Sequence, residues 1–195
     1  MTAGIRSLVV FHLILLTLAT SACIRRVEQP RSQKTSEAAE QLAEMVRVDQ
    51  ELRLNDTLDC SVVAEASRRH RAAVYELLAR SAIAEPQDLF NAALLLQHAD
   101  PNSCRECYLL AHHLARQAAD LGYNPARYLS AATLDLYLVF GNQPQKYGTQ
   151  YNVDSLGRHY LFPVDDLTSD SERAVWDVPP LDSLKVRVER LNAGK

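Results

Sequence analysis

Apolar residues recur at intervals of three and four over most of the chain after residue 36. This spacing puts them on one face of a helix, and Ser36 is a good N-cap for the first such helix. The segment "ARYLSAATLDLYLVF" is apolar on nearly every face, which is typical of a helix buried at the centre of a fold. The pattern predicts helices over residues 37–54, 61–80, 86–99, 102–121 and 125–140.

The pattern changes after Pro144. Aromatic and β-branched residues surround a "DSLG" turn between Lys146 and Val164, which predicts a β-hairpin. Two short helices are predicted after it, over residues 169–176 and 181–191. We therefore expect a mainly α fold of about five core antiparallel helices, with the hairpin and the short C-terminal helices packed on them. The 195 residues suit a single helical domain, residues 36–195.

The first 22 residues have the features of a signal peptide. The run "SLVVFHLILLTLA" has the length of a signal-peptide hydrophobic region and is short of the roughly 20 apolar residues of a transmembrane helix. The "ATSAC" that follows resembles the lipobox of bacterial lipoproteins, with Thr20 in place of the usual leucine. The resemblance implies that residues 1–22 are a lipoprotein signal peptide and that Cys23 is lipidated. The alternative is an ordinary secretory signal with an incidental cysteine.

Residues 23–35 are polar and lack helical periodicity, which predicts a flexible tether. In the lipoprotein pattern, an aspartate directly after the lipidated cysteine retains the protein at the inner membrane. Ile24 stands there instead, so the resemblance favours the outer membrane where the host has one. The expected location is extracytoplasmic, with the membrane as a partner through the lipid anchor at Cys23.

Charge and cysteine content restrict the chemistry further. The formal net charge of −3, without a basic cluster, argues against a nucleic-acid partner. Among Cys60, Cys104 and Cys107, a disulfide is the simplest interpretation in an oxidising compartment, and free buried thiols are the alternative. Zinc would need two more ligands beside "CREC", and the βαβ setting of a redox CxxC motif is missing. We expect no metal and no cofactor.

Two carboxylates fall on helix faces that the pattern predicts to be buried. Asp135 is the only charged residue between Arg127 and Lys146, so it must be ion-paired, hydrogen-bonded or protonated. Asp49 lies in the apolar stripe of the first helix, and Arg53 one turn later can pair with it.

The histidines allow more than one interpretation. We expect His70 to be a satisfied core or boundary residue, and His112 and His113 to be surface or boundary residues. His98 and Asp100 follow the leucines of the third helix. In the simplest interpretation, His98 complements the helix dipole and Asp100 caps the next helix. In the alternative, His98 is a general base or ligand-binding group that a carboxylate orients. The chain has no GxSxG, no HExxH and no glycine-rich phosphate loop.

Four motifs occur in a recognisable order: "VDQELR", "LLLQHAD", "LDLYL" and "QPQKYGTQ". Their order resembles an uncharacterised bacterial family of α-helical domains, marked by a Gln-His motif followed by a Tyr-Gly-Thr-Gln motif. The likeness extends from about Met45 to Leu184 and implies no particular activity. The positions that it marks in this chain are Asp49, Gln50, Arg53, Gln97, His98, Asp135, Tyr147, Gly148, Thr149 and Gln150.

These marked residues lead to one functional expectation with two alternatives. We expect a lipid-anchored cell-envelope protein that binds a small ligand or peptide in a polar pocket, with Arg53 as its hub and Gly148 letting the hairpin backbone approach. The alternatives are a hydrolase-type enzyme that uses His98 with Asp135 or Asp49, and a structural protein with a sealed buried polar network. The residues expected to converge on this one site are Asp49, Arg53, Gln97, His98, Asp135 and Gln150.

Overall fold

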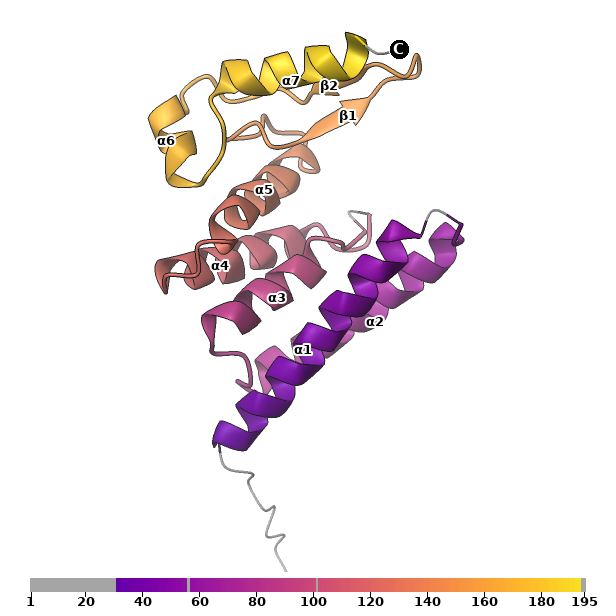
Figure 1. Ribbon diagram of the computed structural model, residues 1–195, viewed down its shortest axis with the longest axis vertical. Helices are drawn as coiled ribbons and strands as arrows, with labels where there is room; N and C mark the ends of the chain where they lie inside the picture. Colours follow the sequence, from indigo (N-terminus) through magenta and orange to yellow (C-terminus); the bar gives the residue numbers. More distant parts are fainter. Residues whose placement is uncertain (1–30, 56, 101, 194–195) are drawn as a thin grey trace, which may run out of the picture. The chain divides into compact units, whose positions relative to one another are not determined.

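The helical pattern of the sequence is realised in five successive helices between Arg31 and Val139. The structure is a computed structural model that describes residues 31–55, 57–100 and 102–193, with side chains from residue 35. The fold is mainly α, as predicted, with one small antiparallel hairpin (Figure 1). No helix in these ranges combines the length and the apolar character that crossing a membrane requires. The five helices are α1 (Arg31–Leu54), α2 (Cys60–Ala79), α3 (Pro86–Leu96), α4 (Glu106–Asp120) and α5 (Ala126–Val139).

Helix α1 begins earlier than its N-cap signal predicts. Ser36 lies inside the helix, and the last five residues of the predicted tether, 31–35, are helical. Between Pro30 and Leu54 the sequence has no proline or glycine, and it is rich in good helix formers, so nothing stops the helix at Ser36. Residues 1–22, Cys23 and the rest of the tether up to Pro30 lie outside the described residues.

Helix α4 begins four residues later than predicted, because Asp100 makes a turn instead of a helix cap. Its Oδ1 accepts a hydrogen bond from the backbone N–H of Asn102 at 3.0 Å, and its carbonyl accepts from the N–H of Cys104 at 2.9 Å. Local side-chain bonds of this kind compete with helix formation. The helix starts only at Glu106, and it ends before Gly122, whose φ of +93° suits the residue after a helix.

Helix α5 takes part in two apolar clusters, but α3, which packs against α1, α2, α4 and α5, is the helix at the centre of the five, so the prediction of α5 as the central element is wrong. The first half of α5 packs against α4 and α3 and contributes Ala126 and Leu129 to the main core, where Leu42, Leu77 and Leu96 are fully buried. Near the middle of α5, Ala131 packs against a separate apolar cluster of the C-terminal segment. The other buried members of that cluster are Tyr147, Val178 and Leu184.

The C-terminal segment forms the predicted hairpin and two short helices. Strands β1 (Tyr151–Val153) and β2 (His159–Leu161) pair antiparallel, and α6 (Asp170–Val175) and α7 (Leu181–Ala193) follow. The side chain of Asn192 in α7 bonds both the N–H (2.7 Å) and the carbonyl (2.9 Å) of His159. One side chain thereby covers part of the free edge of β2 and ties α7 to the hairpin.

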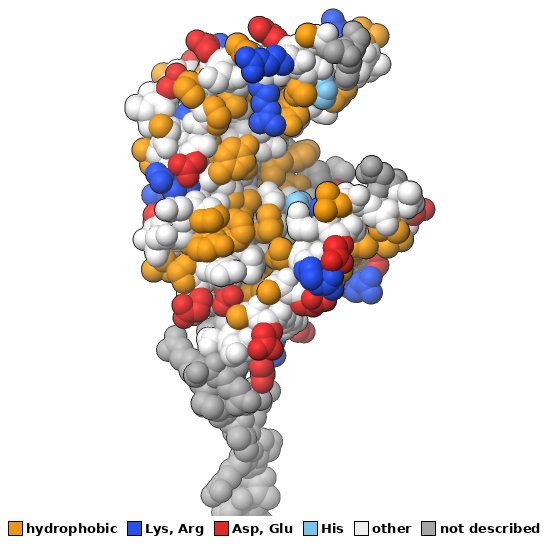
Figure 2. Space-filling view, viewed as in Figure 1, with side chains coloured by type: hydrophobic (Ala, Val, Ile, Leu, Met, Phe, Trp, Pro, Cys, Tyr) orange, Lys and Arg blue, Asp and Glu red, His pale blue; other side chains and the backbone are white. Residues whose placement is uncertain are grey.

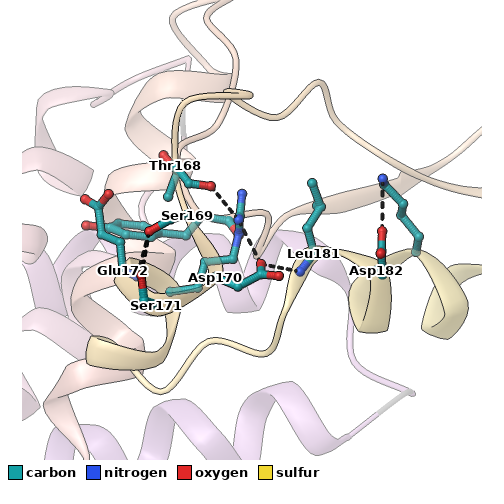
Figure 3. Close-up of polar contacts among 10 residues, drawn as sticks. Thr168, Ser169, Asp170, Ser171, Glu172, Leu181 and Asp182 are labelled. Atoms are coloured by element: carbon teal, nitrogen blue, oxygen red, sulfur yellow. Dashed lines mark hydrogen bonds and ion pairs between the residues drawn. The ribbon is translucent and has the colours of Figure 1, made fainter.

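Polar side chains hold α6 and the start of α7 together (Figure 3). Ser169 caps α6 by accepting a hydrogen bond from the N–H of Glu172. The carboxylate of Asp170 accepts from the N–H of Leu181 at 2.9 Å and from Nη1 of Arg173 at 3.0 Å. These contacts fix the N-terminal end of the six-residue helix α6 and tie it to the first residue of α7.

Candidate functional site

Apart from Gln97, the residues predicted to share one pocket fall into two separate hydrogen-bond networks. One network is centred on Asp49 and the other on Asp135, and no described hydrogen bond joins them. The prediction of a single convergent site is therefore wrong, and so is the prediction of Arg53 as its hub. The partners of Arg53 are Asp49 and Ser67, not Asp135 or Gln150.

The first network gathers side chains from three elements around the buried carboxylate of Asp49, which is 2% exposed. Its Oδ2 accepts hydrogen bonds from Nε of Arg53 at 3.0 Å and from Nδ1 of His98 at 2.7 Å. Its Oδ1 accepts from Nη2 of Arg53 at 3.3 Å, and that nitrogen also donates to Oγ of Ser67 in α2 at 3.0 Å. Asp49 therefore joins α1 to α2 and to the segment after α3.

The charges of this network are fixed by its contacts. Burial disfavours the ionised form of Asp49, but the hydrogen bonds from His98 and Arg53 outweigh it and hold the pKa of the carboxyl below its ordinary value. Nδ1 of His70 lies 3.8 Å from Oδ1 of Asp49, and burial lowers the pKa of that histidine. At neutral pH the network thus holds an Asp49–Arg53 ion pair beside a neutral His70.

The ionised carboxylate also orients His98. An ionised carboxylate can only accept hydrogen bonds, so Nδ1 of His98 must carry the proton that it shares with Asp49. In the neutral ring, Nε2 then has a free lone pair. The contact agrees with the alternative interpretation of the sequence, in which a carboxylate orients His98. The simpler interpretation, in which His98 complements the dipole of α3, does not describe the contact that its side chain makes.

A groove of about 630 Å³ opens beside this network. Its lining comes from the C-terminal end of α1, from α2 between Cys60 and Arg71, and from the segment between α3 and α4. The side chains of His98 and Arg53 are 20% and 31% exposed, and both line the groove together with Ser67. The other lining residues are Leu52, Asn55, Leu58, Cys60, Val63, Ala64, Arg68, Arg71, Asp100 and Ser103.

The second network satisfies Asp135 through backbone groups. The fully buried carboxylate accepts from the N–H groups of Lys146 (2.7 Å), Tyr147 (2.9 Å) and Thr149 (2.9 Å), and from Oγ1 of Thr149 (2.7 Å). Burial raises the pKa of Asp135, and these four donors oppose the rise. Four donors facing two oxygens leave no place for an acid proton, so the geometry fits the ionised form. Of the three states that the sequence allows for Asp135 (ion-paired, hydrogen-bonded or protonated), the structure shows the hydrogen-bonded one.

The Tyr-Gly-Thr-Gln motif builds the turn that encloses Asp135. Gly148 has a φ of +90°, and a Cβ there would lie 3.0 Å from a methyl group of Leu184, so the position requires glycine. The side chain of Gln150 donates to the carbonyl of Ala132 at 3.2 Å. This motif therefore fastens the hairpin to α5, and its role in the described structure is architectural.

Two marked residues take little part in either network. Gln50 is exposed and its Nε2 lies 3.3 Å from Oδ2 of Asp49. Gln97 is the half-buried C-cap residue of α3, and its side chain makes no hydrogen bond within the described residues.

The structure corrects the expectation for His112 and confirms the expectation of a disulfide among the cysteines. His112 is buried, with Nδ1 2.8 Å from the carbonyl of Ser130, and only His113 is exposed. Tyr108, four positions before His112, and Ala115, three positions after it, are buried, which places His112 on the packed face of α4. Among the cysteines, Cys104 and Cys107 form a disulfide, and Cys60 is free and exposed.

Sequence reasoning missed three residues of interest. Ser67 occupies the buried stripe of α2, one position after Ala66, and this periodicity was the signal that could have found it. Arg71 lines the groove but has no motif around it. Arg173 is 2% exposed and donates from Nε to the carbonyl of Tyr147 at 2.9 Å, and nothing in the sequence around it indicates burial.

The surface has no extended area of one charge in the view of Figure 2, where acidic and basic side chains alternate. Within the described residues, no group of three or more His, Cys, Asp or Glu side chains is arranged to hold a metal ion. No family model, curated protein or solved structure matches this chain, so the family resemblance of its motifs stays a prediction.

Proposed function

We propose that this chain is a lipid-anchored cell-envelope protein that binds a small ligand in the groove beside Asp49 and His98. The observation that carries the proposal is the meeting of an oriented histidine, an arginine and a serine at one groove of about 630 Å³. Ligand sites in proteins measure about 300–1,000 Å³ and combine apolar walls with a few well-placed polar groups.

The exposure of the network argues for binding over a purely structural role. A structural network gains most when every polar group is enclosed and paired. Here Arg53 and His98 reach the wall of an open groove, and His98 directs only one of its two nitrogens to Asp49. The network of Asp135 is the opposite case, because every one of its donors is enclosed or part-buried within the fold.

The location rests on the N-terminal sequence and on the disulfide. The lipobox-like "ATSAC" supports lipidation at Cys23. A disulfide between Cys104 and Cys107 suits an oxidising compartment outside the cytoplasm. The test is Cys23→Ala: the variant should move from the membrane to the soluble fraction or keep its signal peptide. Fractionation and mass identical to those of the wild type would contradict lipidation.

A hydrolase is the second candidate, and the contact between Asp49 and His98 favours it. A carboxylate on Nδ1 leaves Nε2 free to take a proton, as in the general bases of hydrolases. Asp135 cannot play this part, because its oxygens are occupied by the turn after α5. No serine or cysteine of the described chain donates a hydrogen bond to His98, so the nucleophile would be a water molecule.

The binding proposal can be tested without knowledge of the ligand. The full-length protein is extracted from its membrane in mild detergent and examined by native mass spectrometry. Ala64→Trp fills the groove from the exposed first half of α2, and Ala72→Trp adds the same indole at an exposed position outside the groove. We expect a bound mass on the wild type and on Ala72→Trp, and its loss in Ala64→Trp. A protein without bound mass, or a mass retained by Ala64→Trp, would contradict the proposal.

A further inference from the structure

One face of α2 forms a continuous wall of the groove. The groove residues of this helix lie at intervals of three, one, three, one and three positions, which is the spacing of a single helix face. They are Cys60, Val63, Ala64, Ser67, Arg68 and Arg71.

This wall is apolar at one end and cationic at the other. Val63 and Ala64 lie at the apolar end, where Leu52 and Leu58 complete the lining. Ser67, Arg68 and Arg71 follow towards the C-terminal end of α2. At a rise of about 1.5 Å per residue, Val63 and Arg71 are separated by about 12 Å along the helix. An occupant that satisfies both ends is therefore an elongated molecule with one apolar and one polar end.

Arg71 determines the charge of the polar end. Arg53 pairs with Asp49, and Arg68 pairs with Glu65. Arg71 is half-buried, and within the described residues its guanidinium has no hydrogen bond and no ion pair. An arginine at the wall of a groove presents a planar set of donors that matches a carboxylate or a phosphate. Arg71 thus offers a place for an anion that none of the described side chains occupies.

Two other features restrict where that anion can lie. The N-terminus of α2 attracts negative charge, but Asp59 already caps it by accepting from the N–H of Ser61 at 2.7 Å. Asp100 also lines the groove, and its carboxylate makes a turn with Asn102 and no ion pair with Arg71. Asp100 disfavours an anion through its like charge, and this effect can be measured.

We propose that the groove binds a monocarboxylate with an apolar substituent, the carboxylate on Arg71 and Ser67 and the apolar part against Val63 and Leu58. This inference rests on the proposed function and names its ligand class. Extended peptide spans about 3.3–3.6 Å per residue, so the 12 Å correspond to the last three or four residues of a peptide. A short fatty acid offers the same chemistry, and the test separates the two sources.

Cys60 provides the readout, since its thiol is exposed and lies at the groove wall. The rate of its alkylation by N-ethylmaleimide is followed by mass spectrometry of the peptide that carries it, without reductant, on the membrane-extracted protein. The probes are N-acetyl-Ala-Ala-Leu and octanoate, each with its carboxamide as the matched neutral control, and acetate as an anion without an apolar part.

We expect at least one of the two acids to protect Cys60, with its amide at least about tenfold weaker, because the amide cannot form the charge-assisted bonds to Arg71. Acetate should not protect. Protection by the peptide acid alone indicates a peptide end, and protection by octanoate alone indicates a fatty acid. Arg71→Gln should weaken the acid about tenfold at an unchanged melting temperature. Asp100→Asn keeps an oxygen for the turn with Asn102, removes the like charge, and should tighten binding a few-fold.

An amide as effective as its acid, or an acid equally effective on Arg71→Gln, would overturn the inference. If no probe protects Cys60 while the wild type still carries a bound mass that Ala64→Trp lacks, the anionic ligand class is wrong and the proposed groove function stands. If both assays are negative, both proposals fail.

Discussion

Asp49→Asn removes the charge at the centre of the first network with almost no change in shape. The wild-type carboxylate accepts two hydrogen bonds from Arg53, one from His98 and a longer one from Gln50. The amide that replaces it can accept at one position only, and it presents an N–H₂ group to donors at the other. Arg53 then keeps its charge without an anionic partner, and its side chain is only 31% exposed.

The cost follows from these contacts. Breaking a fully buried ion pair by removing one partner costs about 3–5 kcal/mol. The partial exposure of Arg53 lets water replace part of the interaction, so the value should be closer to that of a charge-assisted hydrogen bond, about 1.5–3 kcal/mol. We expect Asp49→Asn to lower the free energy of unfolding by about 2 kcal/mol at pH 7.

Urea denaturation followed by circular dichroism measures this difference. Asp120→Asn is the control, because Asp120 pairs with Arg116 at 3.8 Å on the exposed face of α4 and its loss should cost well under about 1 kcal/mol. The pH dependence gives a second measure. The pKa of Asp49 is lowered in the folded state, so its stabilisation is present above its ordinary pKa of 3.8 and is lost as the pH falls through the lower folded value. Asp49→Asn should lack this part of the acid-induced loss. A change in the free energy of unfolding below about 0.5 kcal/mol, together with an unchanged loss of stability at acidic pH, would refute the importance of the Asp49–Arg53 ion pair.

Three further predictions concern the rest of the fold. Asp135→Ala leaves three part-buried or buried backbone N–H groups without an acceptor, so it should lower the free energy of unfolding, measured by urea denaturation, by about 3 kcal/mol or more. Asp182→Ala, at an exposed site, is the neutral control. Gly148→Ala should lower stability by about 1–2 kcal/mol, because its φ is +90° and the new methyl group meets Leu184; an unchanged melting temperature would contradict this geometry. Burial lowers the pKa of His70 in the folded state. Below the ordinary pKa of 6.5 the unfolded chain therefore binds more protons than the folded one, and the free energy of unfolding decreases as the pH is lowered. His70→Gln should flatten the stability profile between about pH 7 and 5, and an unchanged profile would mean that His70 titrates equally in both states.

Local patterns in the sequence were sufficient for most of the secondary structure. The five long helices, the hairpin and the two short helices lie where periodicity and turn residues predict them. The two wrong helix starts, at Ser36 and Asn102, both depended on a single capping residue. A capping side chain stabilises a helix by about 1 kcal/mol. The helix-forming residues before Ser36 outweigh that contribution at the start of α1, and the turn at Asp100 outweighs it before α4.

The contacts of Asp49 show which part of a site the sequence contains. Arg53 lies four positions later on the same helix face, so that pair follows from helical geometry alone. His98 lies 49 positions away, and its contact depends on how α3 packs against α1, which periodicity does not specify. The groove and Arg71 depend on the same packing. The sequence motifs lead us to expect Asp49 and His98 at one site, but periodicity alone could not show that His98 contacts Asp49 and not Asp135.

The division of the marked residues into two networks follows from the limited capacity of each carboxylate. An ionised carboxylate offers about four lone-pair positions. Those of Asp135 are filled by a turn 11 to 14 residues further along the chain, and no position is left for Arg53. The motif Tyr-Gly-Thr-Gln provides that turn, so the covalent proximity of the motif to α5 satisfies Asp135 without any distant residue. Asp49 lacks such a turn nearby and is satisfied by side chains, Arg53 from its own helix and His98 from the segment after α3, and both line the groove. The buried carboxylate of Asp49, which the local backbone does not satisfy, thus brings a distant side chain to the surface of the groove. Asp135 is satisfied by nearby backbone groups, and this separates its architectural network from the candidate site at Asp49.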